Sequence, residues 1–284
     1  MKSGILGTCL RGLVSFAAIA LVLFSMRGKL LESLAILRSE VILKWFVLGM
    51  ATYFGAQIFL ALRFFNILQL HEIRIGFGEV LYLVFISLFF NLFLPSAVGG
   101  DVVKAYFVYK HCNNKMESTI SVIVDRLIGF AALMGMAGAA VLLFGNQIPD
   151  PKIRWIVYAA VGIVILALLF LGSKGLARPF KPFTLLVPSS KWREKLFALY
   201  DGLYAYRNHL QALIGGILLS LIAQALFILV VYWMALSLGI HLGLSLFFIL
   251  VPVAVIASMA PSLGGLGVRE AGLIYVFHWA TSSE

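Results

Sequence analysis

The chain has 284 residues, of which 62% are hydrophobic and only 12% are charged. A soluble domain of this length has too little interior to bury so much apolar surface, so lipid must be the solvent for much of the chain. The net charge of +10 would suggest nucleic-acid binding in a soluble protein, but here the basic residues lie in short loops between apolar segments, as in membrane proteins.

Uncharged apolar segments occur along the whole chain, and a segment near 20 residues matches the ~30 Å hydrocarbon thickness of a bilayer. The first one follows a basic residue like a signal peptide, but no small-x-small cleavage site comes after it, so we interpret it as a retained helix. The predicted fold is all-α and polytopic, and 1–284 form a single membrane domain. We expect membrane helices at residues 4–26, 41–62, 79–94, 120–144, 153–172, 210–238, 244–260 and 268–281.

Residues 29–38 and 192–210 have the pattern of amphipathic helices. In the second segment, apolar residues recur at helical spacing and charged residues occupy the opposite face. This pattern is typical of a helix in the headgroup layer, but a solvated helix that packs on its own protein would show it too.

The distribution of Lys and Arg predicts the orientation in what we expect to be a bacterial inner membrane. The segment 173–209 carries seven of them, which places it in the cytoplasm. The N-terminus, the segment 110–119 and a loop that contains Arg63 and Arg74 are predicted to be cytoplasmic as well. Residues 79–109 would then enter the membrane and return rather than cross it.

Two apolar runs are interrupted in the same manner. Each interruption begins with Pro-Ser, at Pro95 and Pro261, passes through a Gly-Gly pair, and reaches charged residues that open a new helix. A pair of Pro/Gly-broken segments in two halves of a chain is typical of a transporter substrate site and suits an inverted repeat. Ordinary turn chemistry between helices would produce the same residues.

The new helices, starting near Gly100 and Gly267, could direct backbone N–H groups at an anion such as phosphate. Charges in apolar surroundings usually face a cavity or a partner. Arg126 and Arg269 are therefore candidates to bind a lipid phosphate. Asp101, Asp125 and Glu270 would orient these arginines or carry a proton, although Asp125 and Arg126 could also be a pair at the membrane surface.

At these residues the sequence resembles a known family. Three blocks carry the resemblance: Asn-x-x-Leu-Pro-x-x-x-Gly-Gly-Asp-x-x-Lys-Ala-Tyr at 91–106, Val-Asp-Arg-Leu at 124–127, and Pro-x-x-Gly-Gly-Leu-Gly-Val-Arg-Glu at 261–270. In this order and spacing they are similar to the lysylphosphatidylglycerol synthase transmembrane-region family, whose members are also called flippase-like domain proteins. The family usually has Arg at the position of Lys104, which here keeps the charge and loses the guanidinium fork.

The resemblance implies a membrane domain that moves a phospholipid between leaflets, without the soluble synthase module. Family members usually continue with at least one more helix after the third block, so we expect the natural chain to extend beyond Glu284. The predicted substrate-binding residues are Pro95, Gly99, Gly100, Asp101, Lys104, Asp125, Arg126, Pro261, Gly264, Gly265, Gly267, Arg269 and Glu270.

Three functions remain open from the sequence. The first is a non-enzymatic lipid flippase or transporter whose partners are membrane lipids with an anionic or isoprenoid-linked head group. The second is a scaffold that recruits a lipid-modifying enzyme or glycosyltransferase through 173–209. The third is a membrane-embedded enzyme acting on lipid phosphates. We expect no cofactor or metal, because the five histidines are isolated and no nucleotide-binding glycine loop is present.

Overall fold

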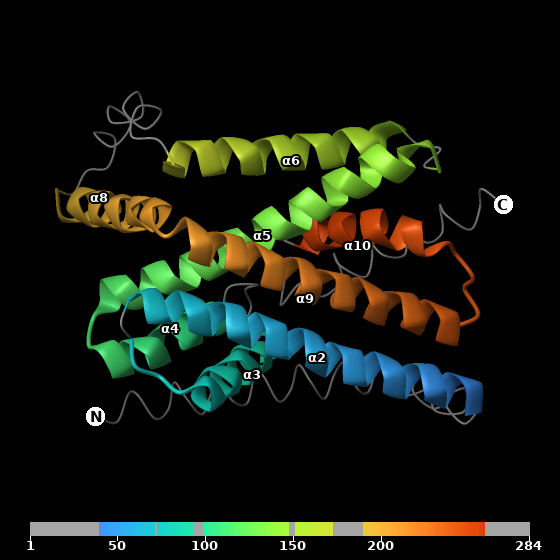
Figure 1. Cartoon of the computed structure of the whole chain (residues 1–284), viewed down its shortest axis with the longest axis horizontal. Coiled ribbons are helices and arrows are strands. Elements are labelled where there is room, and N and C mark those ends of the chain that lie inside the picture. Colours follow the sequence, from blue (N-terminus) through green and yellow to red (C-terminus); the bar gives the residue numbers. More distant parts are fainter. Residues whose placement is uncertain (1–39, 72, 94–98, 148–150, 173–189, 259–284) are drawn as a thin grey trace.

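The computed structural model describes residues 40–71, 73–93, 99–147, 151–172 and 190–258, and all its regular elements there are helical. The helices are α2 (Glu40–Leu70), α3 (Phe77–Phe93), α4 (Gly99–Cys112), α5 (Lys115–Phe144), α6 (Pro151–Gly172), α8 (Ser190–Ala205), α9 (Leu210–Ser237) and α10 (Leu244–Ser258). Short 3-10 turns follow α5 (Gly145–Gln147) and α8 (Tyr206–Asn208). Figure 1 shows α2 and α9 side by side along most of their length, with α5 crossing behind α9.

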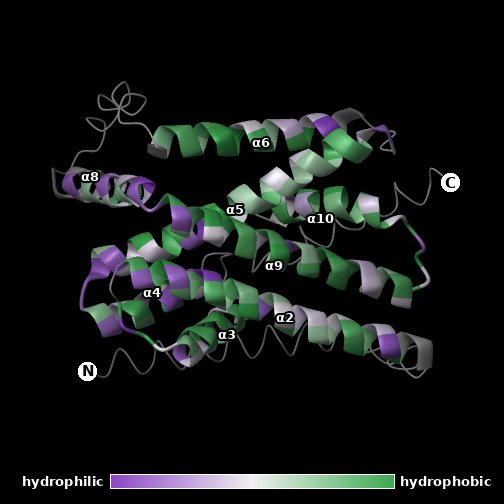
Figure 2. Cartoon of the chain, viewed as in Figure 1, coloured by the Kyte–Doolittle hydropathy of each residue, from purple (hydrophilic) through white to green (hydrophobic). Residues whose placement is uncertain are grey.

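Three of the described helices are long and apolar enough to cross a membrane: Leu43–Leu70, Lys115–Phe144 and Leu210–Ser237. Many large apolar side chains on α2, α6 and α9 are exposed, which fits a surface that contacts lipid. In Figure 2 the hydrophobic colour covers the bodies of α6 and α9, and the hydrophilic colour gathers at α8 and the nearby helix ends. The predicted all-α polytopic membrane fold is confirmed.

Several predicted boundaries differ from the structure. The helix predicted at 41–62 continues to Leu70, so Arg63 lies inside α2 and the prediction that it lies in a loop is wrong. The helix predicted at 120–144 begins at Lys115, where the side chain of Asn114 caps it by accepting hydrogen bonds from two backbone N–H groups. The segments predicted at 4–26, 29–38 and 268–281 lie outside the described residues.

The segment predicted as one amphipathic helix at 192–210 consists of α8, a 3-10 turn and the start of α9. Leu199 and Leu203 of α8 pack against a buried cluster that contains Ile120 and Val124 of α5. Gly202 lies where a Cβ atom would be 2.2 Å from the end of the Ile120 side chain. The apolar face of this part of α8 therefore packs on its own protein. Contact of α8 with the headgroup layer stays a prediction.

Helices α3 and α4 form a hairpin that packs against α2. At ~1.5 Å per residue the two helices are about 25 Å and 21 Å long, against about 46 Å for α2. Their shared core includes Phe64 and Leu68 of α2, Val80 of α3 and Val108 of α4. The membrane re-entry of residues 79–109 stays a prediction.

Gly100 shows why the first broken segment needs glycine. A Cβ atom at this position would lie 2.0 Å from the backbone oxygen of Ser87 in α3. The backbone N–H of Gly100 donates to Oδ1 of Asn91, at 2.8 Å. Gly99 and Gly100 both lie in the first turn of α4, and neither has a positive φ. Close approach of two helices, rather than an unusual backbone shape, thus explains Gly100.

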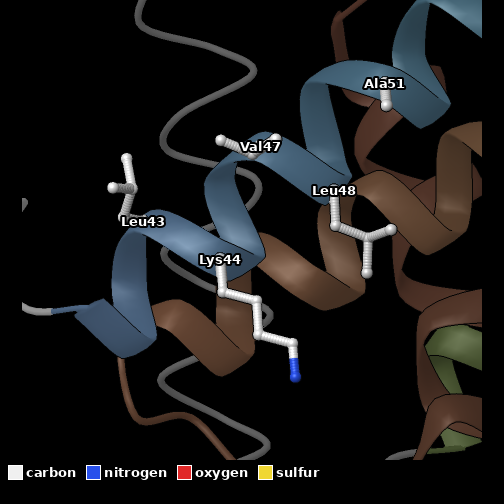
Figure 3. Close-up of a pocket in the computed structure, with 5 residues that line it drawn as sticks. All are labelled: Leu43, Lys44, Val47, Leu48 and Ala51. Atoms are coloured by element: carbon white, nitrogen blue, oxygen red, sulfur yellow. The ribbon is translucent and has the colours of Figure 1, made fainter.

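At the opposite end of α2 from Arg63, five residues line a shallow apolar groove (Figure 3): Leu43, Lys44, Val47, Leu48 and Ala51. The ammonium of Lys44 lies 5.7 Å from the centre of the Trp45 ring. Lys and Trp side chains near a helix end are typical of a membrane–water interface. The groove is remote from the charged residues described next.

Candidate functional site

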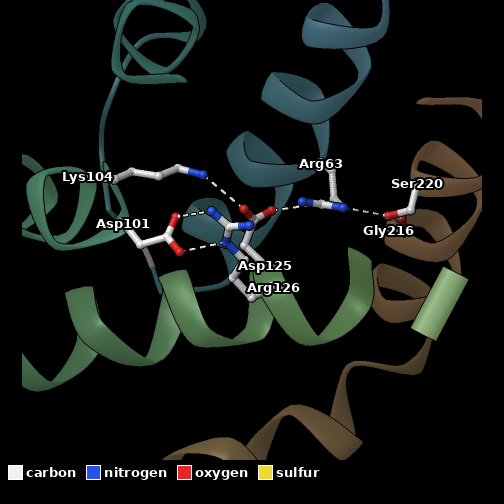
Figure 4. A network of polar contacts seen from close by, with 7 residues as sticks. All are labelled: Arg63, Asp101, Lys104, Asp125, Arg126, Gly216 and Ser220. Atoms are coloured by element: carbon white, nitrogen blue, oxygen red, sulfur yellow. Dashed lines mark hydrogen bonds and ion pairs between the residues drawn. The ribbon is translucent and has the colours of Figure 1, made fainter. Parts of the chain in front are cut away.

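Two helices bring four charged residues together in crossed pairs. Asp101 and Lys104 are one turn apart on α4, and Asp125 and Arg126 are adjacent on α5. Arg126 donates from Nε and Nη2 to the two carboxylate oxygens of Asp101, at 2.6 and 2.8 Å. Lys104 donates from Nζ to Oδ2 of Asp125, at 2.9 Å. The Asp101–Arg126 pair and the Lys104–Asp125 pair thus join α4 to α5 at two points (Figure 4).

Arg63 of α2 adds a second cation to Asp125. Its Nε donates to Oδ1 of Asp125 at 2.7 Å, and its Nη1 donates to the hydroxyl of Ser220 in α9 at 2.9 Å. Ser220 in turn donates to the backbone oxygen of Gly216, one helical turn earlier, at 2.7 Å. Arg63, Lys104 and Asp125, called the buried triad below, therefore connect α2, α4 and α5, and Arg63 also reaches α9 (Figure 4).

Gly129 of α5 leaves space for the Arg63 side chain. A Cβ atom at Gly129 of α5 would lie 2.9 Å from Nη1 of Arg63. A Cβ atom at Gly216 of α9 would lie 3.8 Å from Cγ of Arg63, and 3.3 Å from the Ile128 side chain. The backbone of α5 therefore approaches the guanidinium more closely than a larger residue at Gly129 would allow, whereas a Cβ atom at Gly216 would make only ordinary contact with Arg63.

The two sets of charges differ in exposure. The side chains of the buried triad are 6–7% exposed. Lys104 also places its ammonium 3.6 Å from the centre of the Phe64 ring, a cation–π contact on its apolar side. Arg126 exposes 44% of its side chain, whereas its partner Asp101 exposes 9%. The pair with Asp101 uses two of the five N–H donors of the guanidinium, so Arg126 is the charged group best placed to receive an anion.

The charged residues lie at one depth in the helix bundle. Arg63 is seven residues before the end of α2, and Asp125 and Ser220 are each ten residues after the start of α5 and α9. At ~1.5 Å per residue these positions lie about 10–15 Å from helix ends that meet on the same side of the molecule (Figure 1). In a bilayer, charges at this depth are expensive and usually serve function.

Of the predicted site residues, Asp101, Lys104, Asp125 and Arg126 come together, and Gly99 and Gly100 start the helix that carries two of them. Asp101 accepts hydrogen bonds from Arg126 through both carboxylate oxygens, and its predicted role of orienting this arginine for a lipid stays a prediction. Asp125 contacts Arg63 and Lys104, and it is too buried to form the surface pair with Arg126 that was the alternative. The predicted residues outside the described part of the chain are Pro95, Pro261, Gly264, Gly265, Gly267, Arg269 and Glu270.

The backbone N–H of Gly100, predicted to contact an anion at the start of α4, already donates to the side chain of Asn91. Arg63 and Ser220 also belong to the site, and neither was predicted from the sequence. A signal for Arg63 was present: the residues from Phe64 to Leu70 contain no Gly or Pro, so nothing in them ends the helix. Ser220 is a single hydroxyl in an apolar helix and carries no such signal.

Gln57 is a further buried polar residue, 3% exposed, on α2. Its Oε1 has no hydrogen-bond partner in the described part of the structure. Helical spacing places Gln57 on the same face of α2 as Ala61, Phe64 and Leu68, which pack against α3 and α4. The unpaired oxygen therefore belongs to the face of α2 that meets the α3–α4 hairpin.

A second polar contact fixes the loop side of the bundle. The hydroxyl of Tyr206 and Nε2 of His71 form a hydrogen bond that joins the end of α2 to the turn before α9. Burial lowers the pKa of His71 and raises the pKa of Tyr206. The tyrosine therefore keeps its proton and donates to a neutral imidazole.

Among the described residues, no group of three or more His, Cys, Asp or Glu side chains could hold a metal ion. The fold and the site together define a polytopic helical membrane protein with an ion cluster between its helices. The profile of the lysylphosphatidylglycerol synthase TM region family matches residues 9–284, and the chain belongs to that family. No curated protein and no solved structure matches the chain.

Proposed function

We propose that this protein is a flippase-like transporter that moves a phospholipid, or another lipid with an anionic head group, between the leaflets of a bacterial inner membrane. The observation that carries the proposal is the half-exposed Arg126, held by both oxygens of Asp101 beside a buried triad of charges. An arginine in this state can bind a phosphate through its remaining donors at low cost in side-chain ordering. Membership of a family of membrane regions supports the same proposal.

The crossed pairs suggest how binding would act on the protein. A phosphate that binds the remaining donors of Arg126 would weaken its pair with Asp101, because two anions then share one guanidinium charge. Asp101 would then be free to move, while the Lys104–Asp125 pair keeps α4 attached to α5. The α3–α4 hairpin is therefore the element we propose to respond to the lipid. The predicted second arginine, Arg269, would serve the other half of the path.

Movement of the lipid through proton transfer by Asp101 or Asp125 has little support. Asp101 accepts two hydrogen bonds from a guanidinium, and each oxygen of Asp125 accepts one from a different cation. All four carboxylate oxygens are thus occupied by cationic donors. We therefore propose that these two acids orient cations rather than carry protons.

The test is a flipping assay with the full-length protein in vesicles. Trace amounts of a phospholipid labelled on its acyl chain would be added, and a membrane-impermeant quencher would report how fast the label leaves the inner leaflet. Arg126→Gln should lower the rate at least about tenfold, the usual size of losing a charge-assisted contact. Arg74→Gln is the matched control, since Arg74 is an exposed arginine in the loop between α2 and α3.

Normal flipping by Arg126→Gln would overturn the assignment of Arg126. If the unaltered protein flips no lipid at all, the transport proposal is wrong and the scaffold function, in which 173–209 recruits an enzyme, becomes the better one. The scaffold function predicts that deleting 173–209 abolishes recruitment of the enzyme. Changing Arg126 should leave that recruitment unchanged.

A further inference from the structure

The ion cluster, defined as Arg63, Lys104, Arg126, Asp101 and Asp125, holds three cations and two carboxylates. The Asp101–Arg126 pair is neutral, whereas the buried triad has two cations on one carboxylate and carries one positive charge in excess. Removing Arg63 or Lys104 would leave a neutral ion pair in its place. The excess charge therefore depends on Asp125 being shared.

The surroundings of Arg63 indicate that the protein is built to retain this charge. Gly129 leaves room for the guanidinium, and a Cβ atom there would lie 2.9 Å from Nη1. Ser220 accepts a hydrogen bond from the same nitrogen. A buried charge without a counter-ion of its own is costly, and an apolar residue at position 63 would avoid that cost. When an anion binds at the half-exposed Arg126, it supplies a counter-ion for the excess charge of the buried triad.

We infer that Arg63 is a specificity-determining residue, which acts through the shared Asp125 to make the site prefer lipid head groups with a net negative charge over zwitterionic ones. The inference rests on the proposed function, in which Arg126 contacts the phosphate. Arg126 binds the phosphate that both classes of lipid have, whereas the excess charge of the buried triad favours the head group with no compensating ammonium. Arg63 itself need not touch the lipid.

The experiment measures a ratio, so that a general loss of activity does not decide it. Full-length protein in vesicles of phosphatidylethanolamine and phosphatidylglycerol receives a trace of one or the other lipid, labelled on its acyl chain. The measured quantity is the flipping rate of phosphatidylglycerol divided by that of phosphatidylethanolamine. Native mass spectrometry of the purified protein in an equal mixture of the two lipids gives the corresponding binding ratio.

Arg63→Met should lower the ratio about tenfold, the effect expected of one unit charge acting over a short distance in a medium of low effective dielectric. Lys104→Met removes the same charge and keeps an Arg63–Asp125 pair, so it should lower the ratio to a similar extent and serves if Arg63→Met does not fold. Arg63→Lys keeps the charge and should keep the ratio. Arg74→Met removes an exposed cation outside the cluster and should leave the ratio unchanged.

An unchanged ratio in Arg63→Met and Lys104→Met, with flipping still measurable, would overturn the inference and leave the proposed function intact. A lowered ratio in Arg63→Lys as large as in Arg63→Met would also overturn it, since shape rather than charge would then matter. Absence of any flipping by the unaltered protein would refute the proposed function and this inference with it.

Discussion

The structure predicts that Asp125 contributes more than Asp101 to the free energy of unfolding, although the sequence shows no difference between them. Asp125→Asn removes the only carboxylate of the buried triad and leaves Arg63 and Lys104 close together and 6–7% exposed. Removing one partner of a buried ion pair costs about 3–5 kcal/mol. Asp101→Asn leaves Arg126, whose side chain is 44% exposed and can turn to solvent or headgroups. Because only the arginine of this pair is exposed and can find new partners, its loss should cost closer to the ~0–1 kcal/mol of a surface pair.

The free energy of unfolding should therefore fall by at least about 2 kcal/mol more in Asp125→Asn than in Asp101→Asn. Denaturant titrations in mixed micelles, followed by tryptophan fluorescence and circular dichroism, would measure both losses. The two changes are chemically identical, so each variant is the control for the other. Equal losses would refute the reasoning that burial separates the two pairs.

A variant without any charge in the buried triad extends this test. Replacing Arg63, Lys104 and Asp125 together by Met, Met and Leu removes the unpaired charges as well as the attraction between them. Such replacements are often neutral or stabilising in other proteins. We expect this variant to be more stable than Asp125→Asn and inactive in flipping. Recovery of stability without activity would show that the charges serve the site rather than the fold.

Three further predictions concern packing and pH. Gly100→Ala should destabilise the protein by about 1–3 kcal/mol in the same titration, because the added methyl meets a backbone oxygen of α3, whereas Gly78→Ala, with nothing within 4 Å of its Cβ, should have little effect. Gln57→Met should raise the free energy of unfolding by about 1–3 kcal/mol, because it removes a buried acceptor that has no partner in the described structure. A lower free energy of unfolding would show that the fold needs the amide. Burial holds the pKa of His71 below 6.5, so its contribution to the free energy of unfolding should be fully present above pH 6.5 and be lost as the pH falls below that value. His71→Phe should reduce this pH dependence of stability in thermal scans. An equally steep profile in the variant would assign the dependence to another group.

The sequence by itself determined the class of protein and most of the helices. Apolar composition and helix length require lipid as solvent, and those properties belong to each segment without reference to its neighbours. The charges on α4 and α5 were identifiable for the same reason, since Asp101, Lys104, Asp125 and Arg126 stand out in apolar surroundings. Their predicted role in binding a lipid stays a prediction.

Only the tertiary structure decided which charges meet. Arg63 and Asp125 are 62 residues apart, and Ser220 is 157 residues from Arg63, so their contact depends on how α2, α5 and α9 cross. The same crossing explains Gly100, whose lack of a side chain matters because Ser87 of α3 lies against it. Sequence spacing fixes the face of a helix on which a residue lies, but the partner of that face is set by the packing of the whole bundle.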